Sequence, residues 1–231
     1  MMKLYTPFEL EQLQQDLPCL TETMQWVQNF LARKHPDLGR PGPVCPFVPQ
    51  ALKTDTIRLA VVPAQRLNIQ QIEELVLDYR DAFLEIEPTQ KEAALNKAFL
   101  IIFPDIAIED TTTLIDGIQQ KLKPLFVEQG LMLGEFHKRN ETPGLHNPHF
   151  RPLQSPIPML AIRFMVESDL PFLETADNPH LRIKYLEAYL RIFANDFKDA
   201  NKLNRAAEIL VLTKKQLLAE NQELVQLASV T

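Results

Sequence analysis

An uninterrupted apolar run at residues 98–103 (AFLIIF) constrains the fold of this chain more than any other feature. The run is short and ends at Pro104, which is typical of a strand, because helices in compact proteins are usually longer. A strand that is apolar at every position is covered on both of its faces. The run therefore predicts a central strand of a sheet, buried on both sides.

The segments around this run predict further strands and helices. Residues 56–62 (TIRLAVV) are rich in β-branched side chains, and residues 131–136 and 159–166 are also strand-like. A helix is expected to begin after Asn68, where apolar residues recur with a helical period as far as Ile86. Other helices are expected at residues 21–34, 114–126, 179–197 and 201–227. Between the first helix and the first strand, the stretch HPDLGRPGPVCPFVPQAL predicts a stiff, extended loop.

The order of these elements is β-α-β-α-β-loop-β followed by two helices, and it predicts an α+β fold. We expect a mixed or antiparallel sheet of about four strands with packed helices, in which the last two strands are antiparallel neighbours. The predicted organisation is a single domain over residues 1–231. It comprises an N-terminal segment (1–20), a core (21–176) and a helical C-terminal extension (177–231).

Composition excludes several classes of protein. The formal net charge of −6 argues against general nucleic-acid binding, which needs a basic face. No apolar run is long enough to cross a membrane, and the N-terminus lacks the apolar core of a signal peptide. Two cysteines in 231 residues do not form a disulfide framework, so a reduced, cytoplasmic protein is expected. Six scattered glycines leave no glycine-rich nucleotide loop.

A long loop at residues 137–158 is the first candidate for function. The segment 132–160 around it holds three of the five histidines and five of the eighteen prolines. Structureless connections of this length are uncommon in compact domains and are usually functional or disordered. Its apolar residues and prolines favour order. The loop is therefore expected to present polar groups as a binding site, or to wrap the fold as a purely structural brace.

The histidines of this segment suggest a metal site. Glu135 and His137 share one face of a strand, because their spacing is i, i+2. With His146 and His149 they supply ligand types that non-haem iron or zinc accepts. The alternative is that His146 and His149, like Asn140 and Asn147, brace the loop by hydrogen bonds.

Two arginines and one cysteine are further candidates. Arg163 interrupts an apolar strand and Arg151 lies beside an aromatic residue, so either could clamp a carboxylate or phosphate. The alternative for Arg163 is a solvent-facing position or a salt bridge. Cys45 precedes a proline that fixes its backbone direction, so it could present sulfur to a metal or haem; otherwise it is a small buried apolar residue.

Two segments carry a resemblance to known families. Together, VCPFVPQALKTDTIRLAVV and GEFHKRNETPGLHNPHFRPLQSPIPMLAIRFMVESDLPFL resemble a bacterial family known only as a domain of unknown function, from about Trp26 to about Leu190. The Cys-Pro-Phe segment is also similar to the YqcI/YcgG family, some members of which are haem-dependent enzymes that hydroxylate a nitrogen. The later motifs of that second family are absent from this chain.

The second resemblance implies a haem site. His137 is then the first choice of axial ligand and Cys45 the second, with Arg151 and Arg163 as partners of propionates or of a substrate carboxylate. Glu135 is a candidate acceptor for orienting a ligating histidine. The apolar slot is expected from the aromatic residues Trp26, Phe47, Phe136, Phe150 and Phe164.

Three functions remain open on the sequence. The first is a haem-dependent oxygenase or N-hydroxylase acting on a small amine or amino-acid-derived ligand. The second is a non-catalytic binding or assembly protein, in which the C-terminal helix forms a homodimer. The third is a non-haem metal enzyme that uses Glu135, His137 and one of the loop histidines.

Overall fold

The computed structural model describes residues 4–7, 9–10, 18–194 and 197–228. The chain divides into two compact units. Unit 1 comprises residues 1–123 and 132–164, and unit 2 comprises residues 124–131 and 165–231. The predicted helical C-terminal segment is present and falls within unit 2.

Unit 1 is built on a mixed sheet of four strands: β1 (Ile57–Val61), β2 (Ala98–Ile102), β3 (Leu131–Phe136) and β4 (Met159–Phe164). The strand order is β1-β2-β4-β3. β1 pairs with β2 in parallel, with Leu59 opposite Leu100, and β2 pairs with β4 antiparallel, with Leu100 opposite Ala161. The predicted α+β class is confirmed, and β3 and β4 are neighbours as expected.

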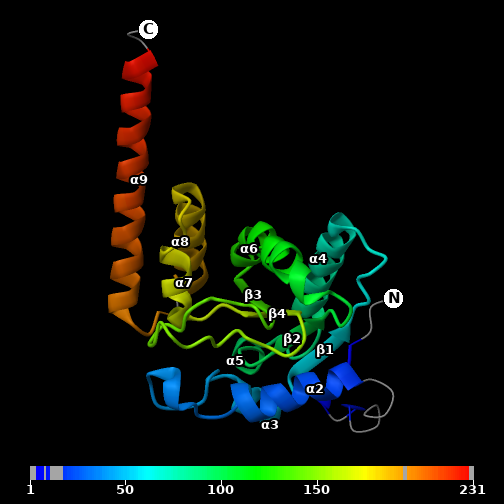
Figure 1. Ribbon diagram of the computed structural model, residues 1–231. Helices are drawn as coiled ribbons and strands as arrows, with labels where there is room; N and C mark the ends of the chain where they lie inside the picture. The colour runs from blue at the N-terminus through cyan, green and yellow to red at the C-terminus, as the bar shows by residue number, and fades with distance from the viewer. Residues whose placement is uncertain (1–3, 8, 11–17, 195–196, 229–231) are drawn as a thin grey trace. The chain divides into compact units, whose positions relative to one another are not determined.

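The central position predicted for residues 98–103 is correct, because β2 lies between β1 and β4 and both of its faces are covered. Leu100 and Ile102 belong to an apolar cluster that also contains Leu20 and Met24 of α2 (Pro18–Trp26) and Ala51 of α3 (Val48–Lys53). On the other face, Phe99 packs edge-on against Phe83 of α4 (Ile69–Glu85). Figure 1 shows α2 and α3 on one face of the sheet, and α4 and α6 (Gly117–Glu128) on the other.

The helices of unit 1 follow the predicted pattern with two changes. Asn68 caps α4 in a capping box with Gln71, as the sequence indicates. The helix predicted at residues 21–34 begins earlier, at Pro18, and continues as a π-helical turn, η1 (Val27–Leu31). The stretch predicted as an extended loop contains α3, because Pro49 near its start suits the first turn of a helix.

Short elements complete the connections. They are η2 (Pro36–Leu38), α5 (Lys91–Ala94), η3 (Ile108–Asp110), η4 (Thr112–Asp116) and η5 (Glu167–Asp169). η4 is a π-helical turn that runs directly into α6.

Unit 2 contains α7 (Leu170–Glu174), α8 (Pro179–Phe193) and α9 (Ala200–Ala228). The last two correspond to the helices predicted at 179–197 and 201–227; residues 195–196 lie outside the described residues. The Glu167 carboxylate accepts hydrogen bonds from the amides of Lys198 and Asp199, just before α9. No helix in the described part of the chain is both long and apolar enough to cross a membrane.

Candidate functional site

A π-helical turn positions the acidic residue of the candidate site. η4 ends at Asp116, and π-helical turns are rare and frequently occur at functional sites. The Thr111 hydroxyl donates to the carbonyl of Ile108 at 2.8 Å, which fixes the start of this turn. One turn further on, Gln119 donates its side-chain amide to the carbonyl of Leu133 at 2.9 Å. Asp116 is thereby held over the end of β3.

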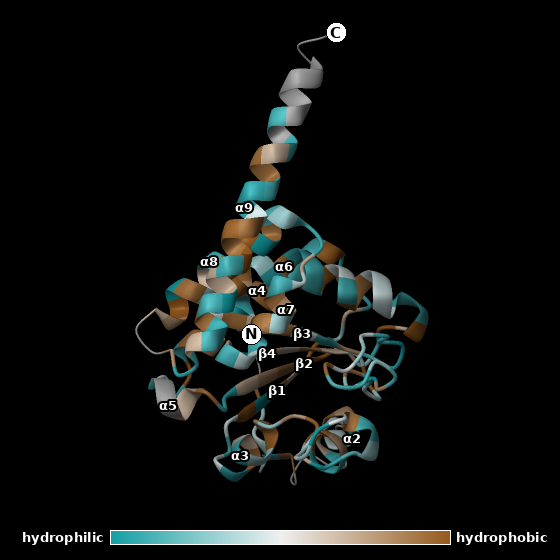
Figure 2. Cartoon of the chain, turned by 90° about the vertical axis from the view of Figure 1, so that its left-hand side faces the viewer, coloured by the Kyte–Doolittle hydropathy of each residue, from teal (hydrophilic) through white to brown (hydrophobic). Residues whose placement is uncertain are grey.

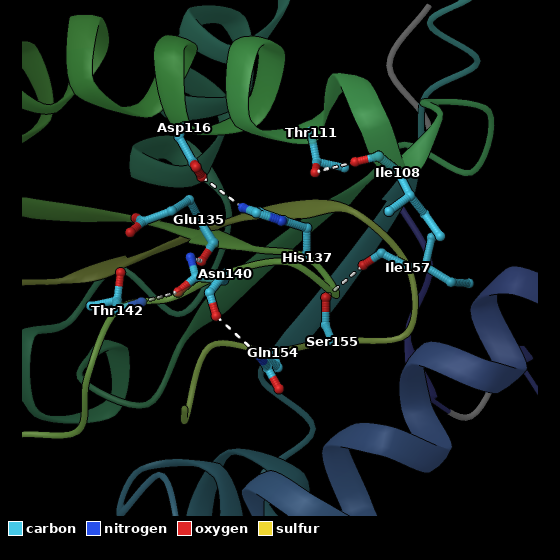
Figure 3. A network of polar contacts seen from close by, with 10 residues as sticks. All are labelled: Ile108, Thr111, Asp116, Glu135, His137, Asn140, Thr142, Gln154, Ser155 and Ile157. Atoms are coloured by element: carbon cyan, nitrogen blue, oxygen red, sulfur yellow. Dashed lines mark hydrogen bonds and ion pairs between the residues drawn. The ribbon is translucent and has the colours of Figure 1, made fainter. Parts of the chain in front are cut away.

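His137 follows β3 directly and meets Asp116. The His137 side chain is fully buried, and its Nε2 lies 2.8 Å from Oδ1 of Asp116, which is 22% exposed. Figure 3 shows the carboxylate reaching from the helical layer to the imidazole ring. The other ring nitrogen, Nδ1, is buried and has no hydrogen-bond partner among the described residues.

The two ring nitrogens of His137 therefore have different roles. A carboxylate only accepts hydrogen bonds, so Nε2 carries the proton and donates a hydrogen bond to Asp116. In the tautomer that carries its proton on Nε2, Nδ1 offers an unused lone pair. The arrangement presents one oriented nitrogen ligand or proton acceptor, with a carboxylate behind it.

Glu135 and Asn140 lie beside this pair. Burial raises the pKa of the Glu135 carboxyl, and the negative charge of Asp116 adds to the rise, while Lys123 and a hydrogen bond from Asn140 oppose it. Asn140 is buried, donates to the backbone carbonyl of Glu135 at 3.3 Å and accepts from the amide of Thr142 at 2.9 Å. Glu135, His137, Asn140 and Asp116 form what we call the His137 cluster (Figure 3).

Polar side-chain contacts order the loop that follows. Asn147 donates to the backbone carbonyl of Asp37 at 2.7 Å and thereby attaches the loop to η2. Arg151 donates to the carbonyl of Pro148 at 2.6 Å and pairs with Glu141 at 3.1 Å. Within the structure, Arg151 is therefore a brace of the loop.

The predicted metal ligands do not converge. His146 and His149 are exposed, whereas His137 is buried. Among the described residues, no group of three or more His, Cys, Asp or Glu side chains is placed to hold a metal ion. The loop histidines thus do not complete a site around Glu135 and His137.

The other predicted cofactor residues lie on the opposite face of the sheet. The Arg163 guanidinium lies 5.6 Å from the ring centroid of Phe47, which directly precedes α3, and donates to the carbonyl of Phe164 at 2.9 Å. Cys45 is partly buried and packs against the apolar cluster beneath α2 and α3. His137 instead faces the layer of α6.

The aromatic residues predicted to line one slot are divided between the two faces. Phe136 packs edge-on against Trp26 at 5.6 Å, on the side of α2. Phe150 joins that side through Phe30 at 6.1 Å. Phe164 lies 5.1 Å from Phe83 of α4, on the other side of the sheet. These residues are core aromatics of two separate clusters.

Two polar residues of unit 1 were not singled out from the sequence. Asp116 lies inside an apolar helical pattern. The one nearby feature that could draw attention to it as a functional residue is the glycine that follows, Gly117. Lys97 is 1% exposed and donates to the carbonyls of Phe83 and Ile86 at 2.6 and 2.7 Å. Neither partnership leaves a pattern in the sequence, because the partners are 11 to 21 residues away.

The fold and the His137 cluster define an α+β protein in which a buried histidine donates to a partly exposed carboxylate. The chain belongs to the family described as "Domain of unknown function (DUF6875)", which matches residues 20–204. This confirms the predicted membership of a family of unknown function. No curated protein and no solved structure shows significant similarity to the chain.

Proposed function

We propose that this chain binds a cofactor metal through Nδ1 of His137, with haem as the first candidate. The observation that supports the proposal is the buried Nδ1, unpartnered among the described residues, of a ring whose Nε2 is held by Asp116. A histidine that ligates a metal commonly donates its other N–H to a carboxylate, which fixes the ring and raises its basicity. Asp116, rather than Glu135, takes that role here.

The ligand set favours haem over a metal ion held by protein groups alone. Structural and catalytic zinc sites and non-haem iron sites need about three or more protein ligands, whereas haem iron needs one or two. The described residues offer a single buried histidine nitrogen without a hydrogen-bond partner, and no group of three ligands. When bound, haem would supply redox and oxygen chemistry that no side chain provides.

The other residues predicted for a haem site do not fit this position. Cys45, Arg163 and the pair Trp26 and Phe136 lie on the α2–α3 face, away from His137. The proposal is therefore restricted to His137 as ligand and Asp116 as its orienting acceptor. Oxygenase or N-hydroxylase activity is supported by the resemblance of the Cys45 segment alone.

The first test is the absorption spectrum of full-length protein expressed with a haem precursor and then titrated with haemin. We expect a Soret band that is lost in His137→Ala. His146→Ala/His149→Ala is the matched control and should keep the band, because both side chains are exposed on the loop. Asp116→Asn should keep the band and weaken haem affinity about 10- to 100-fold, as loss of an orienting partner does. A folded wild-type protein without a band after haemin titration would refute the proposal.

A second candidate function, a binding or assembly protein, is favoured by a different observation. In α9, Leu212 is 58% exposed and Leu218 is 62% exposed. Exposed apolar side chains gathered on one surface mark interaction sites. This candidate needs no cofactor, so haem-free protein with a defined oligomeric mass would favour it over the first.

A further inference from the structure

One side of α9 carries apolar residues that unit 2 does not cover. Val211 is 50% exposed, and Leu212 and Leu218 are exposed still further. Figure 2 shows brown apolar bands alternating with teal polar ones along the helix. A helix that is apolar on more than the side facing its own fold has surface available for a partner.

The other side of α9 is used within unit 2. Ala206 and Thr213 are buried there, with exposed fractions of 0% and 2%. Lys214 pairs with Glu187 of α8 at 2.6 Å, and Arg205 donates to both carboxylate oxygens of Glu174. The charges of Lys214 and Arg205 are therefore satisfied inside the unit, although Arg205, seven residues before Leu212, lies near the exposed side of the helix.

Two charges that flank the exposed apolar pair are not satisfied in this way. Glu208 and Lys215 are exposed, and neither forms an ion pair with another described residue. Residues 208, 211, 212 and 215 have the spacing i, i+3, i+4, i+7, which places them on one face of a helix. The order along this surface, which we call the 208–215 face, is acid, two apolar residues, base.

We propose that the 208–215 face binds the same face of a second copy of this chain, in antiparallel orientation. This inference rests on the second candidate function and names its partner. A two-fold axis between Val211 and Leu212 brings Glu208 opposite the partner's Lys215, and Lys215 opposite the partner's Glu208. The apolar pairs meet at the centre, which makes the interface self-complementary, as a two-fold dimer requires.

Charge decides the orientation. In a parallel pair, Glu208 would face the partner's Glu208, and Lys215 would face the partner's Lys215. Like charges in direct opposition disfavour association, and opposite charges select partner and orientation in paired helices. The antiparallel pair converts both repulsions into attractions.

Charge reversal in full-length protein tests the proposal, with mass measured by sedimentation equilibrium over a range of concentrations. Wild-type protein is expected to dimerise. Glu208→Lys and Lys215→Glu should each raise the dimer dissociation constant at low salt about tenfold or more, because each places like charges in opposition. A mixture of the two variants should form a heterodimer in which every opposed pair is again acid and base, and E208K/K215E should recover the homodimer.

Glu220→Lys is the matched control, because Glu220 is also exposed on α9 but lies off the 208–215 face. Its dissociation constant should equal that of the wild type. Far-ultraviolet circular dichroism of each variant shows whether the helix is intact. Leu212→Asp provides a second variant. It should abolish the dimer by placing a charge at the apolar centre, while Glu208 and Lys215 stay unchanged.

The outcomes separate the two levels of the proposal. A dimer that Leu212→Asp abolishes but that Glu208→Lys leaves unchanged overturns the antiparallel pairing and leaves assembly through α9 standing. A wild-type protein that is monomeric at every concentration overturns both. Rescue by mixing the two charge variants supports both.

Discussion

Lys97 shows how much a single side chain of this fold depends on distant groups. Its ammonium is buried beneath the C-terminal end of α4, where two backbone carbonyls accept its hydrogen bonds. It also lies 4.5 Å from the ring centroid of Phe83. A cation at the C-terminus of a helix is favoured by the helix dipole, yet burial lowers the pKa of Lys97 from 10.5 to about 8, with Glu87 opposing and Arg58 adding to the fall.

This shift predicts a pH dependence of folding. Between pH 8 and pH 10.5 the unfolded chain binds a proton at this lysine that the folded chain has released, so the free energy of unfolding rises with pH. Below pH 8 both states are protonated and this contribution does not vary. We expect the stability difference between wild type and Lys97→Met, measured by urea unfolding, to move in favour of the wild type across this window.

Lys97→Arg is the second variant for this experiment. Arginine keeps its charge throughout the window, so it should lack the rise that the wild type shows. The free energy of unfolding of the wild type minus that of Lys97→Met should rise from pH 8 to pH 10.5. A difference that stays constant or falls would contradict the lowered pKa of Lys97.

At the scale of elements, the loop at residues 137–158 is fixed by its attachment to the turn at η2. The turn ends at Gly39, whose φ of +76° is unfavourable for residues with a side chain. A Cβ at this position would lie 2.6 Å from the carbonyl oxygen of His146. Together with the Asn147 bond to Asp37, this close approach gives the loop one position on the body of unit 1.

We therefore expect Gly39→Ala to destabilise the protein by about 1–3 kcal/mol, because strain and a backbone clash coincide at that position. The matched control is Gly117→Ala in α6, where φ is −61° and a Cβ would meet nothing within 4 Å. That change should stabilise by about 0.5–1 kcal/mol, since alanine favours a helix interior. Thermal unfolding measures the stability change of both variants. Equal changes would contradict the close packing of the 137–158 loop on the turn at η2.

At the scale of the whole molecule, unit 2 is assembled from two separated segments of the chain. The amide of Met165 donates to the carbonyl of Gly130 at 2.8 Å, and Arg191 donates to the carbonyl of Glu128 at 2.7 Å. Gly130 also lies close to Ile192, whose side chain a Cβ there would meet at 3.0 Å. The segment 124–131 is therefore part of the packing of unit 2.

Because unit 2 needs both segments, we predict that residues 165–231 will not fold by themselves. Produced alone, the fragment should show a weak, non-cooperative helical signal by circular dichroism, since the Glu128–Gly130 contacts are missing. A polypeptide that joins residues 124–131 to 165–231 through a flexible linker should recover cooperative unfolding. A fragment 165–231 that unfolds as cooperatively as the joined one would show that residues 124–131 are dispensable.

The sequence by itself determined the strands, the main helices and the long loop between β3 and β4. The periods of two and 3.6 residues are local, so β2, α4 and α9 are encoded within their own segments. Asn68 and Asn147 could be read as a cap and a brace because such roles follow from residue type. The family membership also follows from sequence.

Only the tertiary structure decided which residues meet. His137 was singled out from its position at the end of a strand, but its partner Asp116 is 21 residues away on a π-helical turn that no local pattern predicts. The haem hypothesis groups Cys45 and Arg163 with His137, whereas in the structure the sheet separates them from it. A local pattern specifies which side of an element is apolar, whereas packing of whole layers decides which face of the sheet each polar group reaches.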